Sequence, residues 1–407
     1  MEYPRTAYIN RLKAVKDKDI VKVITGVRRC GKSYLLKTLY SRYLREQGVD
    51  ESHIIIVSLD LKKYEHLRNS DALYDYIKER MADKKRYYVF LDEVQLVDGF
   101  ESLVNSIKEE FNTDIYITGS NSHFLSSDIN TIFRGRGLEI RVSPLSFAEV
   151  YVAKKWGSYD EAFREYALFG GMPHVLSYSN PEDKSTYLKM LCDTVVTADI
   201  VDRYNVKNAE LFKQVVAFMY STVGSPVSAN HIAGVLREQG HKTVDNETIS
   251  NYLSYLCDAF LFSRVQRFDV RGKQLLKTGA KYYTVDFGLR NAYLNFRQAE
   301  LTTILENIVY SELANRGYNI NIGKNNDREI DFYASKLGGE TYYIQVSYSI
   351  EDANTRAREI GAFADLSEGF KRIIITHDTP LYKLTPEGYH LVNVFDFLLD
   401  PGSLERL

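Results

Sequence analysis

Short apolar runs alternate with helical patterns through the first third of the chain. Ile20 to Thr25 is typical of a buried strand, and from Ser33 onward apolar residues recur three and four positions apart, as on one face of a helix. A second apolar run begins at Tyr87 and ends at two carboxylates, and a third spans Ile115 to Ile117. Alternating strands and helices are typical of a parallel sheet. We therefore predict an α/β core with a parallel sheet for residues 1–150.

The loop between the first strand and the first helix carries a phosphate-binding pattern. Its residues fit G-x-x-x-x-G-K-[ST] at Gly26, Gly31, Lys32 and Ser33. Backbone amides and the helix N-terminus would hold the phosphates of ATP, Lys32 would reach the β and γ oxygens, and the Ser33 hydroxyl would bind Mg²⁺. A glycine-rich turn with a surface lysine is the alternative, and the flanking strand and helix argue against it. The predicted nucleotide-binding residues are Gly26, Val27, Arg28, Arg29, Cys30, Gly31, Lys32, Ser33 and Tyr34.

Two acidic residues close the second strand, in the segment YYVFLDEVQ. An ATPase of this type needs one carboxylate at the end of a strand to hold Mg²⁺ and a neighbouring one to polarise the attacking water. We assign Asp92 to the metal and Glu93 to the water. A buried strand that runs into an acidic turn would look the same in isolation, but it would not explain the phosphate loop upstream.

The third strand is followed by polar residues at positions 118–121. A side chain there would lie beside the γ-phosphate, because the carboxyl ends of parallel strands share one edge of the sheet. Ser120 or Asn121 could orient the water, and we name Asn121 as a candidate catalytic residue. A Ser/Asn turn that caps the next helix is an equal alternative.

The order of these motifs resembles a known family. The third strand ends in the letters TGS, and it is followed by a GR turn with Arg134 and Arg136 and then by a PLSF motif. Further motifs along the chain are FGGMP, DIVDRYNVKN and LENIVYSELANRGY. The chain thereby resembles bacterial and archaeal AAA-type ATPases that carry a C-terminal domain of unknown function. That resemblance implies Arg136, with Arg134 second, as the arginine that neutralises charge on the γ-phosphate. Such a guanidinium can act in cis or from a neighbouring subunit, and a solvated basic turn is the alternative.

Helical patterns dominate residues 151–207, where we predict a lid over the nucleotide, with a plain helical spacer as the alternative. Residues 208–290 then show three short helices and two strands, the order of a winged helix. Its third helix, Asn246 to Phe260, offers few cations to DNA phosphates. The hairpin, or wing, offers more, and its cations are Arg264, Arg267, Arg271, Lys273, Lys277 and Lys281. A DNA grip and a solvated hairpin in a protein-packing module both fit this pattern.

Residues 291–407 return to alternating strands and helices and look like the restriction-endonuclease fold. Glu306, Asp331 and Gln345 occupy the positions of its metal-binding acids, but Ser347 stands where those nucleases carry a lysine. Without that cation, and with a neutral Gln345, we expect a degenerate nuclease-like module that serves as a binding or assembly surface.

Length and composition limit the number of domains and the kinds of partner that the chain can have. The chain has 407 residues and a net charge of −2, so about two to four domains are expected and any DNA contact must come from a local patch. The three scattered cysteines suit a reducing cytosol and argue against structural zinc. No apolar run reaches the length of a membrane span. We predict a cytoplasmic, Mg²⁺-dependent ATPase that switches its C-terminal modules. DNA, another protein and a second copy of the chain are possible partners, and a weak metal-dependent nuclease is a third interpretation.

Overall fold

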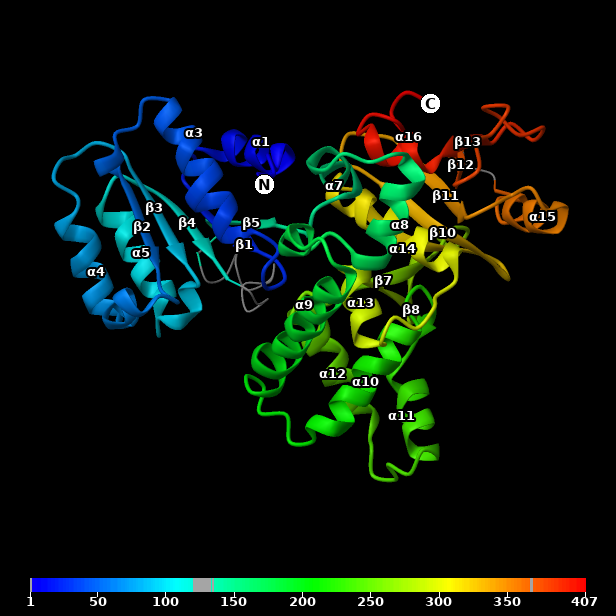
Figure 1. The fold of residues 1–407 in the computed structure, drawn as a ribbon, viewed down its shortest axis with the longest axis horizontal. Coiled ribbons are helices and arrows are strands. Elements are labelled where there is room, and N and C mark those ends of the chain that lie inside the picture. The colour runs from blue at the N-terminus through cyan, green and yellow to red at the C-terminus, as the bar shows by residue number, and fades with distance from the viewer. Residues whose placement is uncertain (1, 120–132, 134, 367–368) are drawn as a thin grey trace. The chain divides into compact units, whose positions relative to one another are not determined.

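The computed structural model describes residues 2–119, 133, 135–366 and 369–407, with only the backbone described at 277 and 278. These residues form two compact units (Figure 1). The N-terminal unit comprises residues 1–144 with 258–260, and the C-terminal unit comprises residues 145–257 with 261–407. No helix in the described ranges is long and apolar enough to cross a membrane.

A five-stranded sheet forms the centre of the N-terminal unit, with all strands parallel and in the order β2-β3-β4-β1-β5. The strands are β1 (Val21–Thr25), β2 (Ile54–Ser58), β3 (Tyr87–Asp92), β4 (Thr113–Thr118) and β5 (Gly137–Arg141). The helices are α1 (Thr6–Val15), α2 (Lys32–Tyr34), the π-helical η1 (Leu35–Tyr40), α3 (Ser41–Glu46), α4 (Ser70–Glu79) and α5 (Phe100–Glu110). Every residue of β1, β3 and β4 is buried, as expected for parallel strands covered on both faces. The predicted parallel α/β core is confirmed.

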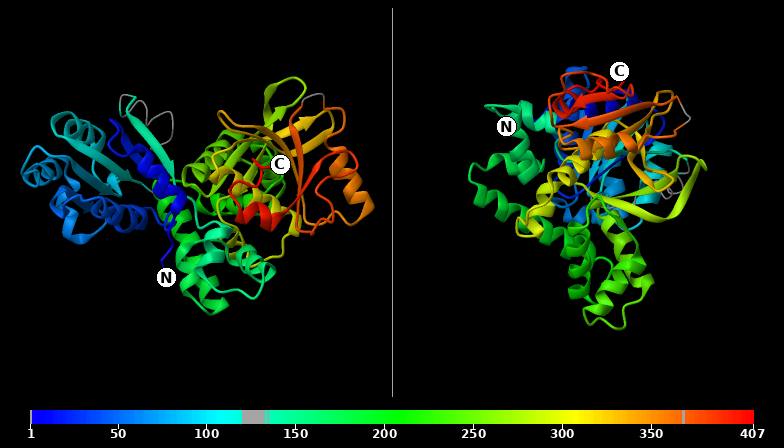
Figure 2. Two further views of the ribbon diagram at one scale, coloured as in Figure 1. Left: turned by 90° about the horizontal axis from the view of Figure 1, so that it is seen from above. Right: turned by 90° about the vertical axis from the view of Figure 1, so that its right-hand side faces the viewer.

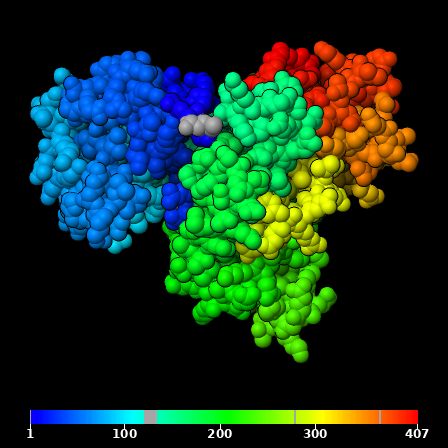
Figure 3. All heavy atoms as spheres, in the orientation of Figure 1, coloured from blue at the N-terminus to red at the C-terminus, as the bar shows by residue number. Residues whose placement is uncertain are grey.

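Residues early in the chain, drawn in blue to cyan, form the surface of the N-terminal unit that is visible in Figure 3. α2, η1 and α3 follow one another without a break, so residues 32–46 form one helix with a π-helical middle. Such π segments inside α-helices occur frequently at functional sites. This helix begins directly after the predicted phosphate loop.

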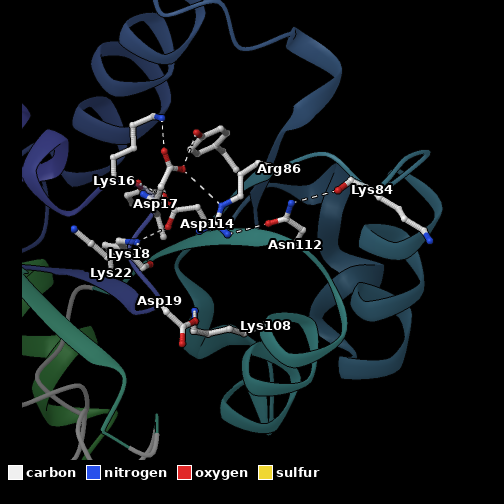
Figure 4. Close-up of polar contacts among 12 residues, drawn as sticks. Lys16, Asp17, Lys18, Asp19, Lys22, Lys84, Arg86, Lys108, Asn112 and Asp114 are labelled. Carbon is white, nitrogen blue, oxygen red and sulfur yellow. Dashed lines mark hydrogen bonds and ion pairs between the residues drawn. The ribbon is translucent and has the colours of Figure 1, made fainter.

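A buried ion pair lies at the amino ends of β1 and β4 (Figure 4). The Lys22 ammonium donates a hydrogen bond to the Asp114 carboxylate, and neither side chain has solvent exposure. The other Asp114 oxygen accepts from the Tyr116 hydroxyl at 2.8 Å, and Tyr116 in turn contacts the Tyr40 hydroxyl at 2.8 Å. Burial lowers the pKa of Lys22, while the adjacent carboxylate opposes that shift. The network ties β1 to η1 at the end of the sheet opposite the predicted phosphate loop.

An eight-stranded mixed sheet forms the centre of the C-terminal unit, in the order β13-β12-β11-β10-β9-β7-β8-β6. Its strands are β6 (Pro226–Val227), β7 (Phe262–Asp269), β8 (Gln274–Thr284), β9 (Asn319–Asn325), β10 (Arg328–Ser335), β11 (Thr341–Ser347), β12 (Lys371–Thr376) and β13 (His390–Asn393). Figure 2 shows the later strands, yellow to orange, side by side in this sheet. The helices are α7 (Phe147–Ala153), α8 (Tyr159–Phe169), α9 (Pro181–Thr194), the π-helical η7 (Val195–Val201), α10 (Ala209–Ser221), α11 (Ala229–Glu238), α12 (Asn246–Asp258), α13 (Phe287–Tyr293), α14 (Leu301–Asn315), α15 (Ala353–Gly361) and α16 (Val394–Leu399).

The hairpin β7–β8 belongs to the same sheet as the last hundred residues. β7 pairs antiparallel with β8 on one side and parallel with β9 on the other. Strand pairing therefore crosses the border at residue 290 that the sequence pattern predicts between two modules. The division into four parts stays a prediction.

The FGGMP segment is anchored by one buried carboxylate. Asp286, just before α13, accepts hydrogen bonds from the backbone N–H of Gly171 at 2.7 Å and of Leu289 at 3.1 Å. Gly170 ends α8 with a φ of 71°, and a Cβ there would lie 2.0 Å from an Asp286 oxygen. Gly170 is therefore required for the close approach of this segment to Asp286, and a Cβ at Gly171 would lie 2.0 Å from the Leu145 carbonyl oxygen.

Asp286 makes the stability of the C-terminal unit pH-dependent. Burial raises its pKa from 3.8 to about 6, although its backbone donors oppose the shift. The folded state then binds the proton more tightly than the unfolded chain, so the contribution of Asp286 to stability is greatest below pH 4 and is lost as the pH rises through 6. The size of this loss is about 3 kcal/mol.

Urea unfolding followed by the fluorescence of Trp156, the only tryptophan, measures this effect in the C-terminal unit. We expect the unfolding free energy of wild type, relative to that of Asp286→Asn, to fall by about 2 kcal/mol between pH 4 and pH 7. Asp327→Asn, which removes an exposed carboxylate of the same unit, is the control. Parallel pH curves for wild type and Asp286→Asn would contradict the assignment.

Candidate functional site

Two glycines shape the loop between β1 and α2. Gly26 has a φ of 139° and Gly31 a φ of 106°, both in the range that favours glycine. A Cβ at Gly26 would lie 2.1 Å from the carbonyl oxygen of Val142, so only glycine fits there. Arg29 also has a positive φ, of 67°. The conformation explains why the sequence pattern places glycines at these two positions.

The side chains of the loop divide into buried and accessible ones. Lys32 is buried, and its ammonium donates to the carbonyls of Gly26 at 2.8 Å and Val27 at 3.1 Å. The buried Cys30 thiol donates to the Val142 carbonyl at 3.2 Å. Among the other predicted loop residues, Val27 is buried, Arg28, Gly31, Ser33 and Tyr34 are half-buried, and Arg29 is exposed. The Lys32 ammonium thus closes the loop through hydrogen bonds to its own backbone.

The predicted metal residues Ser33 and Asp92 lie together. Asp92 is the last residue of β3, and its Oδ1 accepts from the Ser33 hydroxyl at 2.8 Å and from the Thr118 hydroxyl at 2.6 Å. Its Oδ2 accepts from the Lys37 ammonium at 2.7 Å. Carboxylate and hydroxyl oxygens are ligands that Mg²⁺ prefers, so this set of donors fits the metal.

Two polar residues of this site were not singled out from the sequence. Lys37 lies four residues after Ser33, and its ammonium also donates to the Ser58 hydroxyl at 3.0 Å. Ser58 ends β2 and pairs in register with Asp92 on β3. The spacing of Ser33 and Lys37, one helical turn, is the signal that could have identified the lysine.

Glu93 follows Asp92 in a strained backbone conformation, with a φ of 56°. Its backbone N–H donates to the Thr118 hydroxyl at 3.0 Å, and its carboxylate accepts from the side chain of Gln95. Left-handed non-glycine residues occur often at functional sites, where neighbouring contacts hold them. The role of Glu93 toward water stays a prediction.

The candidate arginine lies at the other edge of the sheet. Arg136 directly precedes β5, and its carbonyl accepts from the backbone N–H of Val21, where β1 begins. The phosphate loop follows the opposite end of β1, roughly 17 Å away for a five-residue strand. Arg136 therefore does not reach the loop of its own unit, and a role in trans stays a prediction. Asn121, Ser120 and Arg134 lie outside the described residues.

The three nuclease-like residues also lie together, in the C-terminal unit. Glu306 on α14, Asp331 on β10 and Gln345 on β11 line one pocket of about 550 Å³. The Asp331 backbone N–H donates to the Gln345 side chain at 3.2 Å. Burial, reinforced by Glu306, raises the pKa of Asp331 well above its usual value. Across the described ranges, no three His, Cys, Asp or Glu side chains are arranged to hold a metal ion.

Lys281 belongs to this pocket region, and its prediction as an exposed wing cation is wrong. It is buried on β8, and its ammonium lies 3.0 Å from Glu306 and 2.8 Å from Glu329. The Tyr283 hydroxyl donates to the same Glu306 oxygen at 2.6 Å. Burial alone would lower the pKa of Lys281, but Glu306, Asp331 and Glu329 together raise it.

Other wing cations also contact their own unit. Arg267 lies 3.7 Å from Glu329, and the Arg271 guanidinium donates to the Asn325 side chain at 3.0 Å. Arg264 and Lys273 are exposed, and the side chain of Lys277 is not described. The cations of the hairpin are therefore not a free set directed at a polyanion.

Comparisons with known proteins identify two domains in the chain. Residues 18–151 match a family described as an AAA domain, and residues 160–300 match one described as a domain of unknown function, DUF8612. An uncharacterized protein of Haemophilus influenzae is 38% identical over 401 residues, which is 97% of this chain and 98% of that protein. An uncharacterized protein of Methanocaldococcus jannaschii is 29% identical over 404 residues, covering 93% of this chain and 87% of that one.

Two solved structures have a distant similarity. The Aeropyrum pernix ORC1 protein in complex with DNA has a TM-score of 0.31 at 13% identity, covering 72% of this chain and 93% of that one. A DNA polymerase III gamma subunit-related protein of Thermotoga maritima has a TM-score of 0.29 at 13% identity, covering 62% and 99%.

Proposed function

The chain belongs to the family of the Haemophilus influenzae protein and carries an AAA domain. We propose that its N-terminal unit binds ATP with Mg²⁺ and hydrolyses the ATP. The observation that carries the proposal is the meeting of Ser33 and Asp92 beneath the glycine-shaped loop. The two residues come from segments almost sixty positions apart in the sequence, and a metal between hydroxyl and carboxylate would explain why they converge.

The chain's own residues would divide the work as follows. The backbone amides of the loop would hold the phosphates, and the Lys32 ammonium would exchange the carbonyls of Gly26 and Val27 for phosphate oxygens. Ser33 and Asp92 would hold Mg²⁺, which when bound neutralises charge on the phosphates. Glu93 would orient the attacking water and accept its proton.

Hydrolysis would act on the C-terminal unit. We propose that residues 151–207 respond to the nucleotide as a lid and that α10, α11, α12 and the β7–β8 hairpin form a winged-helix-like module. The strands and helices of residues 291–407 would then be the nuclease-like module. A nucleotide-driven switch of this kind would present the C-terminal unit to another protein or a second copy. A cytoplasmic location stays a prediction of the sequence.

DNA is the second candidate partner, through the β7–β8 hairpin. The exposed Arg264 and Lys273 support it. Against it stand the ion pairs of Lys281 and Arg267 with carboxylates of the same unit, since cations already neutralised release few counterions from DNA. We therefore place the protein switch ahead of the DNA-linked ATPase.

Nuclease activity is not part of the proposal. Gln345 and Ser347 replace the carboxylate and the lysine that metal-dependent cleavage needs, and the Lys281 ammonium is paired with two glutamates. We expect no Mg²⁺- or Mn²⁺-dependent cleavage of plasmid DNA by the full chain above the level of Asp331→Ala. Cleavage by wild type that disappears in Asp331→Ala would reverse this view.

The test of the proposed function is ATP hydrolysis by the purified full chain with Mg²⁺, using Lys32→Ala as the blank. Activity above the blank that ignores duplex DNA supports the protein switch. Stimulation by DNA that fades with added salt supports the DNA-linked ATPase. Hydrolysis at the level of the blank would contradict both.

A further inference from the structure

Both oxygens of the Asp92 carboxylate accept hydrogen bonds from donors of the chain itself. Two hydroxyls, from Ser33 and Thr118, share Oδ1, and the Lys37 ammonium takes Oδ2. Asp92 is almost completely buried, with 4% of its side chain exposed, whereas Lys37 is 30% exposed. A buried carboxylate is costly unless it is paired, and Lys37 supplies the compensating charge.

We propose that Lys37 is a positioning residue that holds Asp92 and would compete with Mg²⁺ for its carboxylate. The inference rests on the proposed function, since it concerns the same metal-binding residues. In this arrangement the Lys37 ammonium is an internal cation at Oδ2, and Asp92 would hold Mg²⁺ only if that ammonium left Oδ2 or shared the carboxylate.

The geometry allows such an exchange. Lys37 reaches Asp92 from η1, one turn beyond Ser33, and its second partner is the Ser58 hydroxyl at 3.0 Å. The partly exposed ammonium can therefore leave Oδ2 while remaining near Ser58 or entering solvent. Asp92 has no such freedom, because it ends a fully buried strand and is fixed by Ser33 and Thr118.

Lys37 is one of two ammonium groups near the two carboxylates of the predicted metal site. Asp92 and Glu93 contribute two carboxylates, and Lys32 and Lys37 contribute two ammonium groups. Lys32 rests on loop carbonyls and Lys37 on the metal carboxylate. Removing the Lys37 charge leaves Asp92 with excess negative charge close to where the cation binds, which should attract Mg²⁺ more strongly.

The experiment measures binding and not turnover. A fluorescent, non-hydrolysable ATP analogue is titrated into the full chain at a series of Mg²⁺ concentrations, for wild type, Lys37→Met and Lys37→Arg. We expect the Mg²⁺ concentration for half-maximal binding to fall about tenfold in Lys37→Met. Lys37→Arg keeps the charge and should stay within about twofold of wild type. Lys63→Met, the same substitution at an exposed lysine of this unit, is the control.

The outcomes separate this inference from the proposed function. An unchanged or higher Mg²⁺ requirement in a Lys37→Met protein that binds the analogue overturns the role of Lys37 and leaves the ATP site intact. If the Mg²⁺ concentration for half-maximal binding falls as much in Lys37→Arg as in Lys37→Met, the charge of Lys37 does not compete with Mg²⁺, and the inference is overturned. Absence of analogue binding by wild type at every Mg²⁺ concentration overturns the proposed function, and the inference with it.

Discussion

Alanine at Lys32 should weaken ATP binding by about a hundredfold or more. The Lys32 ammonium is buried at the start of α2, where it donates to the carbonyls of Gly26 and Val27. A charge-assisted hydrogen bond to a phosphate is worth about 1.5–3 kcal/mol, and about 2.8 kcal/mol corresponds to a factor of one hundred. Isothermal titration of the full chain with a non-hydrolysable ATP analogue and Mg²⁺ measures the change.

The control for Lys32→Ala is Lys63→Ala, which removes an exposed ammonium of the same unit. Circular dichroism checks that both variants keep the helix content of wild type. Unchanged affinity in a folded Lys32→Ala protein would show that the loop does not hold phosphates. Loss of affinity in Lys63→Ala as well would indicate a general effect of charge and not a specific contact.

Local sequence was enough to predict the glycine positions of the loop after β1, because the backbone constraint there is local. Gly26 and Gly31 have backbone angles that other residues avoid, and Gly26 faces the Val142 carbonyl too closely for a Cβ. Ser33 and Asp92 could also be paired from the sequence, since the loop after one parallel strand and the end of another meet at one edge of the sheet. Both inferences need only the strand pattern and the direction of the chain.

Side chains that meet through helix orientation or strand order could not be predicted in this way. The spacing of Lys37 from Ser33 could have suggested that it lies near the site, but its contact with Asp92 depends on how η1 is oriented toward the end of β3. The prediction of Lys281 as an exposed hairpin cation failed because the pairing of β7 with β9 is not visible in the pattern of residues. That pairing places the hairpin inside the sheet, where Lys281 meets Glu306 and Glu329.

Arg136 shows what a resemblance leaves open about geometry. The motif order implies an arginine near the γ-phosphate, but Arg136 precedes a strand that runs parallel to β1. A residue before such a strand lies at the amino edge, and the loop lies at the carboxyl edge. The direction of the strand was predictable in principle, and within the proposed ATPase it leaves Arg136 a role only toward a neighbouring molecule.

Glutamine at Glu93 should suppress ATP turnover by about a hundredfold or more and leave ATP affinity within about threefold of wild type. The amide would keep the size of the side chain but could not accept a proton from water. Binding should survive because the contacts of Asp92 with Ser33, Thr118 and Lys37 involve no Glu93 side-chain atom. Steady-state phosphate release and analogue titration of the same preparation measure the two effects.

The matched control for Glu93→Gln is Glu46→Gln, which makes the same change at an exposed position in α3. Loss of turnover with retained ATP affinity would show that the Glu93 carboxylate acts on water and the Asp92 carboxylate on the metal. The two residues are adjacent in sequence, and the backbone turns them apart at Glu93, where φ is 56°. Full turnover in Glu93→Gln would exclude this carboxylate as the base. Parallel loss of affinity and turnover would instead mean that Glu93 supports Asp92, and that the metal site extends over both carboxylates.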